Sequence, residues 1–182
     1  MKNSIIISFC LISVIGCQSS AKPNPLLAVK GDSERAIGQN AVTVVDTGQV
    51  YFKVVGTKNG QPLFNYEGDY PTATQQDTFF TVGLGASRDV SVWSDMLAIT
   101  IYIKQMATGS FPVVGILYAG EGKATMLHTS PKDGNVSQPK KGTVTITKFT
   151  ESMFSGKFEG RSVTQDGSEM SISGVFLNVK YK

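Results

Sequence analysis

Cysteine and histidine are scarce in this chain, whose 182 residues include two cysteines and one histidine. Cys10 lies within an apolar run near the start of the chain, and Cys17 closely follows that run. A chain that loses the run keeps only Cys17, so no intramolecular disulfide can hold its fold together. The single histidine, His128, excludes a metal site built on two histidines, and we expect it in a loop or at a strand end.

Helical periodicity and an excess of charge are also missing. No window repeats apolar residues every 3.6 positions, so we expect little helix. The 17 basic and 14 acidic residues nearly balance, which leaves no strong field for nucleic acid, and we expect no nucleic-acid partner. The Gly-x-Ser-x-Gly motif of many hydrolases is absent. Residues 83–88 lack the third glycine and the helix of a dinucleotide loop, so we interpret them as a turn. No cofactor is expected.

The first seventeen residues have the pattern of a bacterial lipoprotein leader. A short basic start precedes residues 5–15, which are mostly apolar but too few to span a bilayer, since that takes about 20 apolar residues. The run ends in Val14-Ile15-Gly16-Cys17, which resembles a lipobox, where a peptidase cuts before the cysteine and its sulfur takes a diacylglyceryl group. The alternative is an ordinary secretory signal with an incidental cysteine. We predict a signal peptide over 1–16, a lipid anchor on Cys17 and a flexible tether over 17–41.

The residues after Cys17 predict where the anchor lies. In enterobacteria an aspartate directly after the cysteine retains a lipoprotein at the inner membrane, and this chain has Gln18. The acidic run that some bacteria use to export lipoproteins to the surface is also missing from residues 18–22. We therefore predict a protein anchored in the outer membrane with its domain facing the periplasm.

Residues 42–182 read as one antiparallel β-domain, either a sandwich or barrel-like. Nine or ten short segments have strand character, including the alternating run Leu97, Ile99, Ile101 and Ile103, and the segments 111–118 and 123–128. Lys58-Asn59-Gly60 and Asp166-Gly167 are turn signals, because asparagine, aspartate and glycine tolerate a positive φ. The last strand has apolar residues on both faces near its end, so we expect burial on both sides there or a bulge at Gly174.

The last forty residues also resemble a known family. Residues 142–148 read Gly-Thr-Val-Thr-Ile-Thr-Lys, and an apolar-Ser-Gly-x-Phe pattern occurs at 154–158 and again at 172–176. This is similar to the C-terminal signature G-T-V-T-I-T-K followed by I-S-G-T-F in a family of small bacterial lipoproteins, with phenylalanine where the family usually has isoleucine at 154. The resemblance extends over roughly residues 50–182. Its motifs consist of glycines and core residues, so it implies a fold and transfers no active site.

Candidate chemistry is sparse in the rest of the chain. Glu67 and Asp69 lie two residues apart and would share a strand face, and paired carboxylates can carry out glycoside hydrolysis. Their turn-rich segment favours a solvated loop instead, and the same holds for Asp166 and Glu169, which flank a hairpin turn. The candidate ligand-facing aromatics are Tyr51, Tyr66, Tyr70 and Trp93, because tyrosine and tryptophan near loops suit a sugar or peptide surface. Packing without function is the alternative for all four.

Together these features favour a non-catalytic binding or accessory lipoprotein, held to the membrane through Cys17 and presenting a β-domain to a protein, a glycan or a small apolar ligand. A structural envelope protein is the alternative, and an enzyme with an unrecognised carboxylate or tyrosine site is a third possibility.

Overall fold

Eleven β-strands form two antiparallel sheets in the computed structural model of the chain, which describes residues 46–89, 94–131, 135–164 and 166–181. The two sheets pack against each other, so the predicted all-β fold is confirmed and the domain is a β-sandwich. The three-residue 3-10 turn η1 (Ile116–Tyr118) is the only helical element among these residues.

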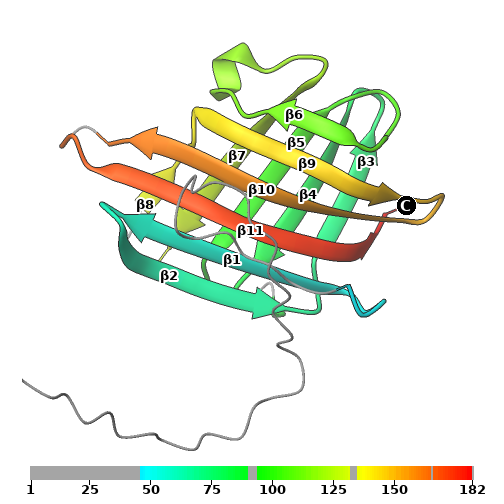
Figure 1. Cartoon of the computed structure of the whole chain (residues 1–182), viewed down its shortest axis with the longest axis horizontal. Helices are drawn as coiled ribbons and strands as arrows, with labels where there is room; N and C mark the ends of the chain where they lie inside the picture. The colour runs from blue at the N-terminus through cyan, green and yellow to red at the C-terminus, as the bar shows by residue number, and fades with distance from the viewer. Residues whose placement is uncertain (1–45, 90–93, 132–134, 165, 182) are drawn as a thin grey trace, which may run out of the picture. The chain divides into compact units, whose positions relative to one another are not determined.

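The strands divide six to five between the sheets. In spatial order, sheet A contains β2 (Gln61–Gly68), β1 (Tyr51–Lys58), β11 (Glu169–Lys180), β10 (Met153–Val163), β9 (Lys141–Phe149) and β6 (Gly109–Pro112). Sheet B contains β3 (Thr72–Gln76), β4 (Phe79–Gly85), β5 (Met96–Tyr102), β7 (Lys123–Ser130) and β8 (Asn135–Ser137). The strands of sheet A run across those of sheet B (Figure 1).

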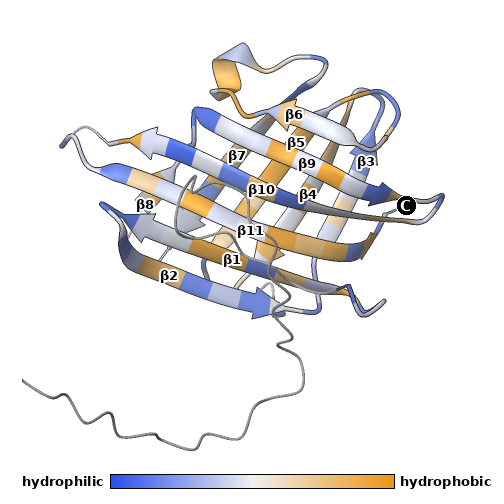
Figure 2. Cartoon of the chain, in the orientation of Figure 1, coloured by the Kyte–Doolittle hydropathy of each residue, from blue (hydrophilic) through white to orange (hydrophobic). Residues whose placement is uncertain are grey.

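The core lies between the sheets and follows the two-residue period of a strand. In β5, Leu97, Ile99 and Ile101 are fully buried, while the residues between them are half-exposed. In β9, Val144 and Ile146 point into the same core, as their alternation with threonines predicts. The alternation is visible as orange bands separated by paler and bluer ones along the strands (Figure 2).

Both predicted tight turns are present, and they touch. Asn59 and Gly60 have φ values of 50° and 77° and join β1 to β2, while Gly167, with φ 78°, lies in the β10–β11 turn. The Asn59 backbone N–H donates to the Glu169 carbonyl (2.8 Å), and the Glu169 N–H donates to Asn59 Oδ1 (2.9 Å). Across the same contact Lys58 Nζ lies 3.3 Å from Asp166 Oδ2. The turns of the two hairpins therefore lie side by side.

The prediction for the last strand is confirmed in one part and wrong in another. Val175 and Leu177 are buried on the outer face of β11 while Phe176 and Val179 are buried on its inner face, so this strand is buried on both sides. A bulge exists too, but it lies four residues beyond Gly174. Ser155 of β10 stands opposite both Leu177 and Asn178, because Gly156 pairs with Phe176 and Phe154 with Val179. Asn178 has a φ of 52°, and this left-handed residue provides the extra position.

The prediction of a strand over residues 111–118 is also wrong beyond its first two residues. β6 ends at Pro112, which has no N–H to donate. Val113 still donates to the Gly142 carbonyl of β9 in sheet A, but it also bridges to Ala124 of β7 in sheet B. The chain therefore changes sheets where a local apolar pattern would continue the strand, and Ile116–Tyr118 forms η1 instead.

Candidate functional site

The predicted aromatic residues do not share one surface. Tyr51 lies on the outer face of β1, where its hydroxyl donates to Glu67 Oε2 at 2.7 Å. Burial and this hydrogen bond both raise the pKa of Tyr51. Tyr66 and Tyr70 instead pack edge-on against the buried Phe52 ring, with centroids 6.4 and 5.6 Å away. Trp93 lies outside the described residues, so it stays a prediction, as does a ligand role for the other three.

Tyr70 is held between the core and a surface ion pair. The Arg88 guanidinium carbon lies 5.3 Å from the centroid of the Tyr70 ring, within the range of a cation–π contact. Arg88 also donates to Asp69, and this contact lowers the pKa of the Asp69 carboxyl. The ring is thus covered by a charged pair on its solvent side.

In each of the two candidate carboxylate pairs, the two carboxylates contact different cations. Glu67 accepts from Tyr51 and lies 3.6 Å from Lys53 Nζ, whereas Asp69 pairs with Arg88. In the other pair, Asp166 faces Lys58 and Glu169 lies 3.8 Å from Arg161. A glycosidase needs one carboxyl kept protonated beside an ionised one. Hydrogen bonds from Thr164 and Ser168 lower the pKa of Asp166, which is the opposite of a general acid.

The position predicted for His128 is wrong. It is the sixth residue of β7 and is only 2% exposed, because the inward row Ala124, Met126 and His128 continues to Ser130. Its ring stacks on Phe64 of β2, with a centroid distance of 4.1 Å and an interplanar angle of 12°. Phe64 can approach this closely because it lies over Gly56, where an added Cβ would be 2.1 Å from Phe64 Cζ.

Two polar atoms are left without partners in this inter-sheet cluster, which we define as Phe64, Tyr66 and His128. The Tyr66 and His128 rings lie 6.4 Å apart and nearly parallel. Tyr66 Oη and His128 Nε2 are both buried, and neither has a hydrogen-bond partner in the described parts of the chain. Burial lowers the pKa of His128 and raises that of Tyr66, with the Asp95 charge opposing the first shift and adding to the second. A neutral imidazole and a neutral phenol are therefore enclosed together.

Such an enclosed imidazole is poorly placed for catalysis. A general base has to reach the proton it removes, directly or through one water. His128 is covered by Phe64, and nucleophile chemistry would need an activated hydroxyl or thiol beside it. The inter-sheet cluster is therefore better explained as packing between β2 and β7 than as a reaction centre.

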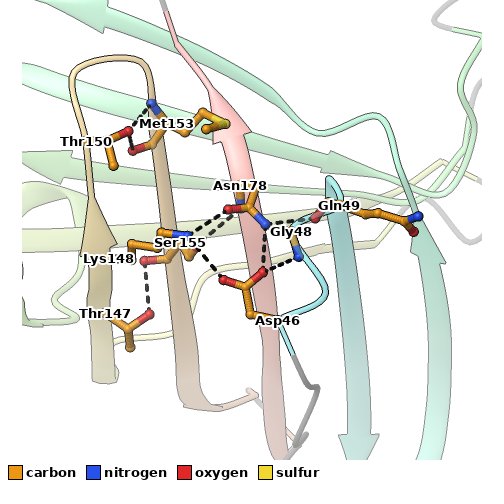
Figure 3. A network of polar contacts seen from close by, with 9 residues as sticks. All are labelled: Asp46, Gly48, Gln49, Thr147, Lys148, Thr150, Met153, Ser155 and Asn178. Atoms are coloured by element: carbon orange, nitrogen blue, oxygen red, sulfur yellow. Dashed lines mark hydrogen bonds and ion pairs between the residues drawn. The ribbon is translucent and has the colours of Figure 1, made fainter. Parts of the chain in front are cut away.

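A polar cluster at the bulge of β11 fastens the start of the described chain. Asn178 Nδ2 donates to Asp46 Oδ1 at 2.9 Å and to the Gln49 carbonyl at 3.0 Å, and its backbone N–H donates to Ser155 Oγ at 2.9 Å. Lys148 Nζ lies 3.5 Å from Asp46 Oδ2. Figure 3 shows these side chains converging from β9, β10, β11 and the segment before β1. We name Asp46, Lys148, Ser155 and Asn178 the clip.

The charge state of the clip follows from its contacts. The Gly48 N–H, the Asn178 amide and the Lys148 ammonium lower the pKa of Asp46 against a smaller opposing effect of burial. Asp46 is thus ionised at neutral pH and accepts all three contacts. The clip fixes the start of the described chain to sheet A, which no local pattern predicts because Asp46 and Asn178 are 132 residues apart.

The η1 tip, which we define as Ile116, Leu117 and Tyr118, is the second feature that the sequence pattern missed. These side chains are 56, 90 and 71% exposed. The pattern of residues 111–118 predicted a strand here, whereas these three residues form a turn on the surface. Gly115 precedes them in extended conformation, and the Tyr118 N–H donates back to the Gly115 carbonyl at 2.8 Å.

Within the described ranges, no group of three or more His, Cys, Asp or Glu side chains is arranged to hold a metal ion. The same residues include no helix long and apolar enough to cross a membrane. The predicted signal peptide, Cys17 and the tether lie outside the described residues. No family model, curated protein sequence or solved structure matches this chain, so the resemblance to small bacterial lipoproteins stays a prediction.

Proposed function

We propose that this chain is an envelope lipoprotein, acylated at Cys17, anchored in the outer membrane and facing the periplasm, whose β-sandwich is a non-catalytic binding or accessory module. The observation that carries the proposal is the sequence Val14-Ile15-Gly16-Cys17 directly after an apolar leader-length run. The polar residues Gln18, Ser19 and Ser20 follow at once, as a tether between anchor and domain requires.

The side chains of the domain support a non-catalytic role. The one histidine is enclosed between two sheets. The four candidate carboxylates each form an ion pair with a lysine or an arginine; they are Glu67, Asp69, Asp166 and Glu169. What the surface offers instead is a fixed β-scaffold with one exposed apolar tip and an aromatic ring, Tyr70, beneath an ion pair. Such features suit recognition rather than bond-breaking chemistry.

A single substitution tests the anchor. Two acyl chains hold a protein at a membrane stably, whereas one chain gives only marginal binding, since each buried CH₂ contributes about 0.8 kcal/mol. Cys17→Ala should therefore leave either unprocessed precursor or protein that no longer incorporates labelled fatty acid. Cys10→Ala is the matched control, because Cys10 lies in the part that is removed, and it should behave as the wild type. Membrane-bound Cys17→Ala protein of normal mobility would contradict the proposal.

The orientation has its own test. Protease added to intact cells should leave a periplasm-facing domain whole, and the same protease should degrade it once the outer membrane is permeabilised. Degradation in intact cells would place the domain on the cell surface instead.

A further inference from the structure

The η1 tip is an unusual run of exposed apolar side chains for this domain. Eight large apolar side chains are exposed among the described residues, and only Ile116, Leu117 and Tyr118 follow one another in the chain. Isolated exposed apolar residues are normal on proteins, whereas adjoining ones mark contact sites. Figure 2 shows the turn, orange in part, projecting beyond the edge strand β6.

The base of the tip is rigid. The Val113 N–H donates to the Gly142 carbonyl in sheet A, and the Val114 N–H donates to the Ala124 carbonyl in sheet B, both at 2.9 Å. On the far side the Gly122 N–H donates to the Tyr102 carbonyl at 2.8 Å. Hydrogen bonds to both sheets therefore hold the three side chains outward. A loop without such bonds could fold them back onto the domain.

Two lysines flank the tip. Lys123 Nζ lies 3.3 Å from the Tyr118 carbonyl, and the Lys140 stem lies beside Gly115, where an added Cβ would be 3.8 Å from Lys140 Cγ. None of the ion pairs between described residues involves either lysine. Glu121 is the acidic residue of the same loop. Apolar side chains with a tyrosine among them, bordered by lysines, match the interface of a phospholipid bilayer, where aromatic rings sit at the headgroup level.

We propose that the η1 tip is a membrane-contact site that inserts Ile116, Leu117 and Tyr118 into the headgroup region of the bilayer that holds the anchor. This inference rests on the proposed function, because the anchor keeps the bilayer within reach. Three side chains are too small a footprint for a stable protein interface, which buries roughly 800 Å² on each partner. They suffice as a second, weak signal beside an anchor, since tethering provides effective concentrations of about millimolar.

The chain is long enough for this contact. The clip holds Asp46 beside Lys148 near the end of β9, whereas η1 follows β6, whose Pro112 pairs with Thr143 near the start of β9. The two points are thus separated by about the length of the nine-residue strand β9, roughly 30 Å at 3.3 Å per residue. The 28 residues of 18–45 can extend over roughly 90 Å at the same rise. An anchored domain can therefore turn its tip to the bilayer.

Fluorescence from a label on the tip tests the proposal without relying on acylation. The chain from residue 17 onward contains every described residue. The test protein is this chain with Cys17→Ser and an N-terminal hexahistidine, which tethers it to vesicles through nickel-chelating lipid. Leu117→Cys then provides its only thiol for an environment-sensitive dye. On vesicles of phosphatidylethanolamine and phosphatidylglycerol we expect a blue-shifted emission that lipids spin-labelled near the headgroup quench. The matched control is Leu63→Cys on β2, which is 50% exposed and lies at the opposite edge of sheet A.

Each outcome decides the question. A shift at position 117 that is absent at 63, and that is lost when Ile116→Asp and Tyr118→Asp are added, supports the contact. Equal spectra at 117 and 63 on vesicles overturn it, even if acylation of Cys17 is established separately. A shift at 117 that appears only when envelope proteins are added would assign the tip to a protein partner and likewise overturn it.

Discussion

The Phe158 ring lies across the bare backbone of Gly174, its cross-strand partner. A Cβ added to Gly174 would be 2.5 Å from Phe158 Cζ and 2.0 Å from the Lys53 carbonyl oxygen on the other side. Two residues away the two strands exchange roles, and Phe176 of β11 covers Gly156 of β10. The two phenylalanine rings stack with their centroids 6.3 Å apart. The glycines of the repeated Ser-Gly-x-Phe pattern thus make room for each other's phenylalanine.

Substitution of these glycines should destabilise the domain. Gly174→Val and Gly156→Val should each lower the free energy of unfolding by about 1–3 kcal/mol, the usual cost of overpacking a core. Gly174 should be the more sensitive, because the backbone oxygen of Lys53 would lie 2.0 Å from its added Cβ, whereas the nearest backbone oxygen at Gly156, that of Thr145, would lie at 2.6 Å. Urea titration measures the effect, and Gly120→Ala, with no atom within 4 Å of the added carbon, is the control. An unchanged or raised midpoint for both valine variants would contradict the packing account.

Asn178 combines a left-handed backbone with a hydrogen-bonding side chain, and two substitutions separate these roles. Asn178→Gly keeps the backbone conformation and loses the contacts with Asp46 and Gln49. Asn178→Ala loses both, so it should be less stable than the glycine variant by about 1–2 kcal/mol, the cost of a left-handed conformation for an ordinary residue. Urea midpoints of the two proteins give this difference directly. Equal midpoints would mean that the bulge relaxes when the side chain is removed.

The buried hydroxyl of Tyr66 should lower the stability of the domain. A buried polar group without a hydrogen bond costs about 1–3 kcal/mol, so Tyr66→Phe should raise the free energy of unfolding by up to that amount. Tyr51→Phe is the matched control, because its hydroxyl donates to Glu67 at 2.7 Å and its loss should leave stability unchanged or slightly lower. Thermal or urea unfolding compares the two. A loss of stability in Tyr66→Phe would show that this hydroxyl has a partner in solution.

His128 should make stability depend on pH in a narrow window. Its pKa in the folded domain is below the ordinary value of 6.5, so below pH 6.5 the unfolded chain binds a proton that the folded chain does not. The contribution is complete above pH 6.5 and is lost as pH falls below it, with a slope of at most about 1.4 kcal/mol per pH unit, the limit for one proton. Aspartates and glutamates titrate mostly below pH 5, and the chain has no other histidine.

Urea titrations between pH 5 and 7 measure that slope. His128→Gln and His128→Phe should each flatten it, whatever their absolute stability, because neither side chain titrates. A slope that persists unchanged in both variants would show that another group is responsible.

Local chemistry explains which parts of the fold the sequence predicts. The alternation of Leu97, Ile99 and Ile101 specifies a strand with one buried face, and Asn59-Gly60 specifies a turn with two positive φ values. Both signals lie within a few residues. The short polar strand β3 (Thr72–Gln76) has no such signal, since it lies at an edge of sheet B and most of its residues are exposed. For this reason the structure has more strands than the nine or ten expected.

The features that sequence reasoning missed depend on distant partners. His128 is buried because Phe64, 64 positions earlier, covers it, and Asp46 is fixed by Asn178 near the other end of the chain. The η1 tip leaves the strand pattern because the Val114 N–H donates to Ala124, on a strand of the opposite sheet. An asparagine inside an apolar strand was the one local hint of the bulge, because asparagine tolerates the left-handed region better than most residues.

The most direct test of the central claim is the intact mass of the protein purified from its native membrane. The account predicts a chain that begins at Cys17 and is heavier than the sequence 17–182 by the mass of a diacylglyceryl group, with or without a further acyl chain on the amino terminus. A chain that begins at another residue, or that carries an unmodified thiol at Cys17, would contradict it.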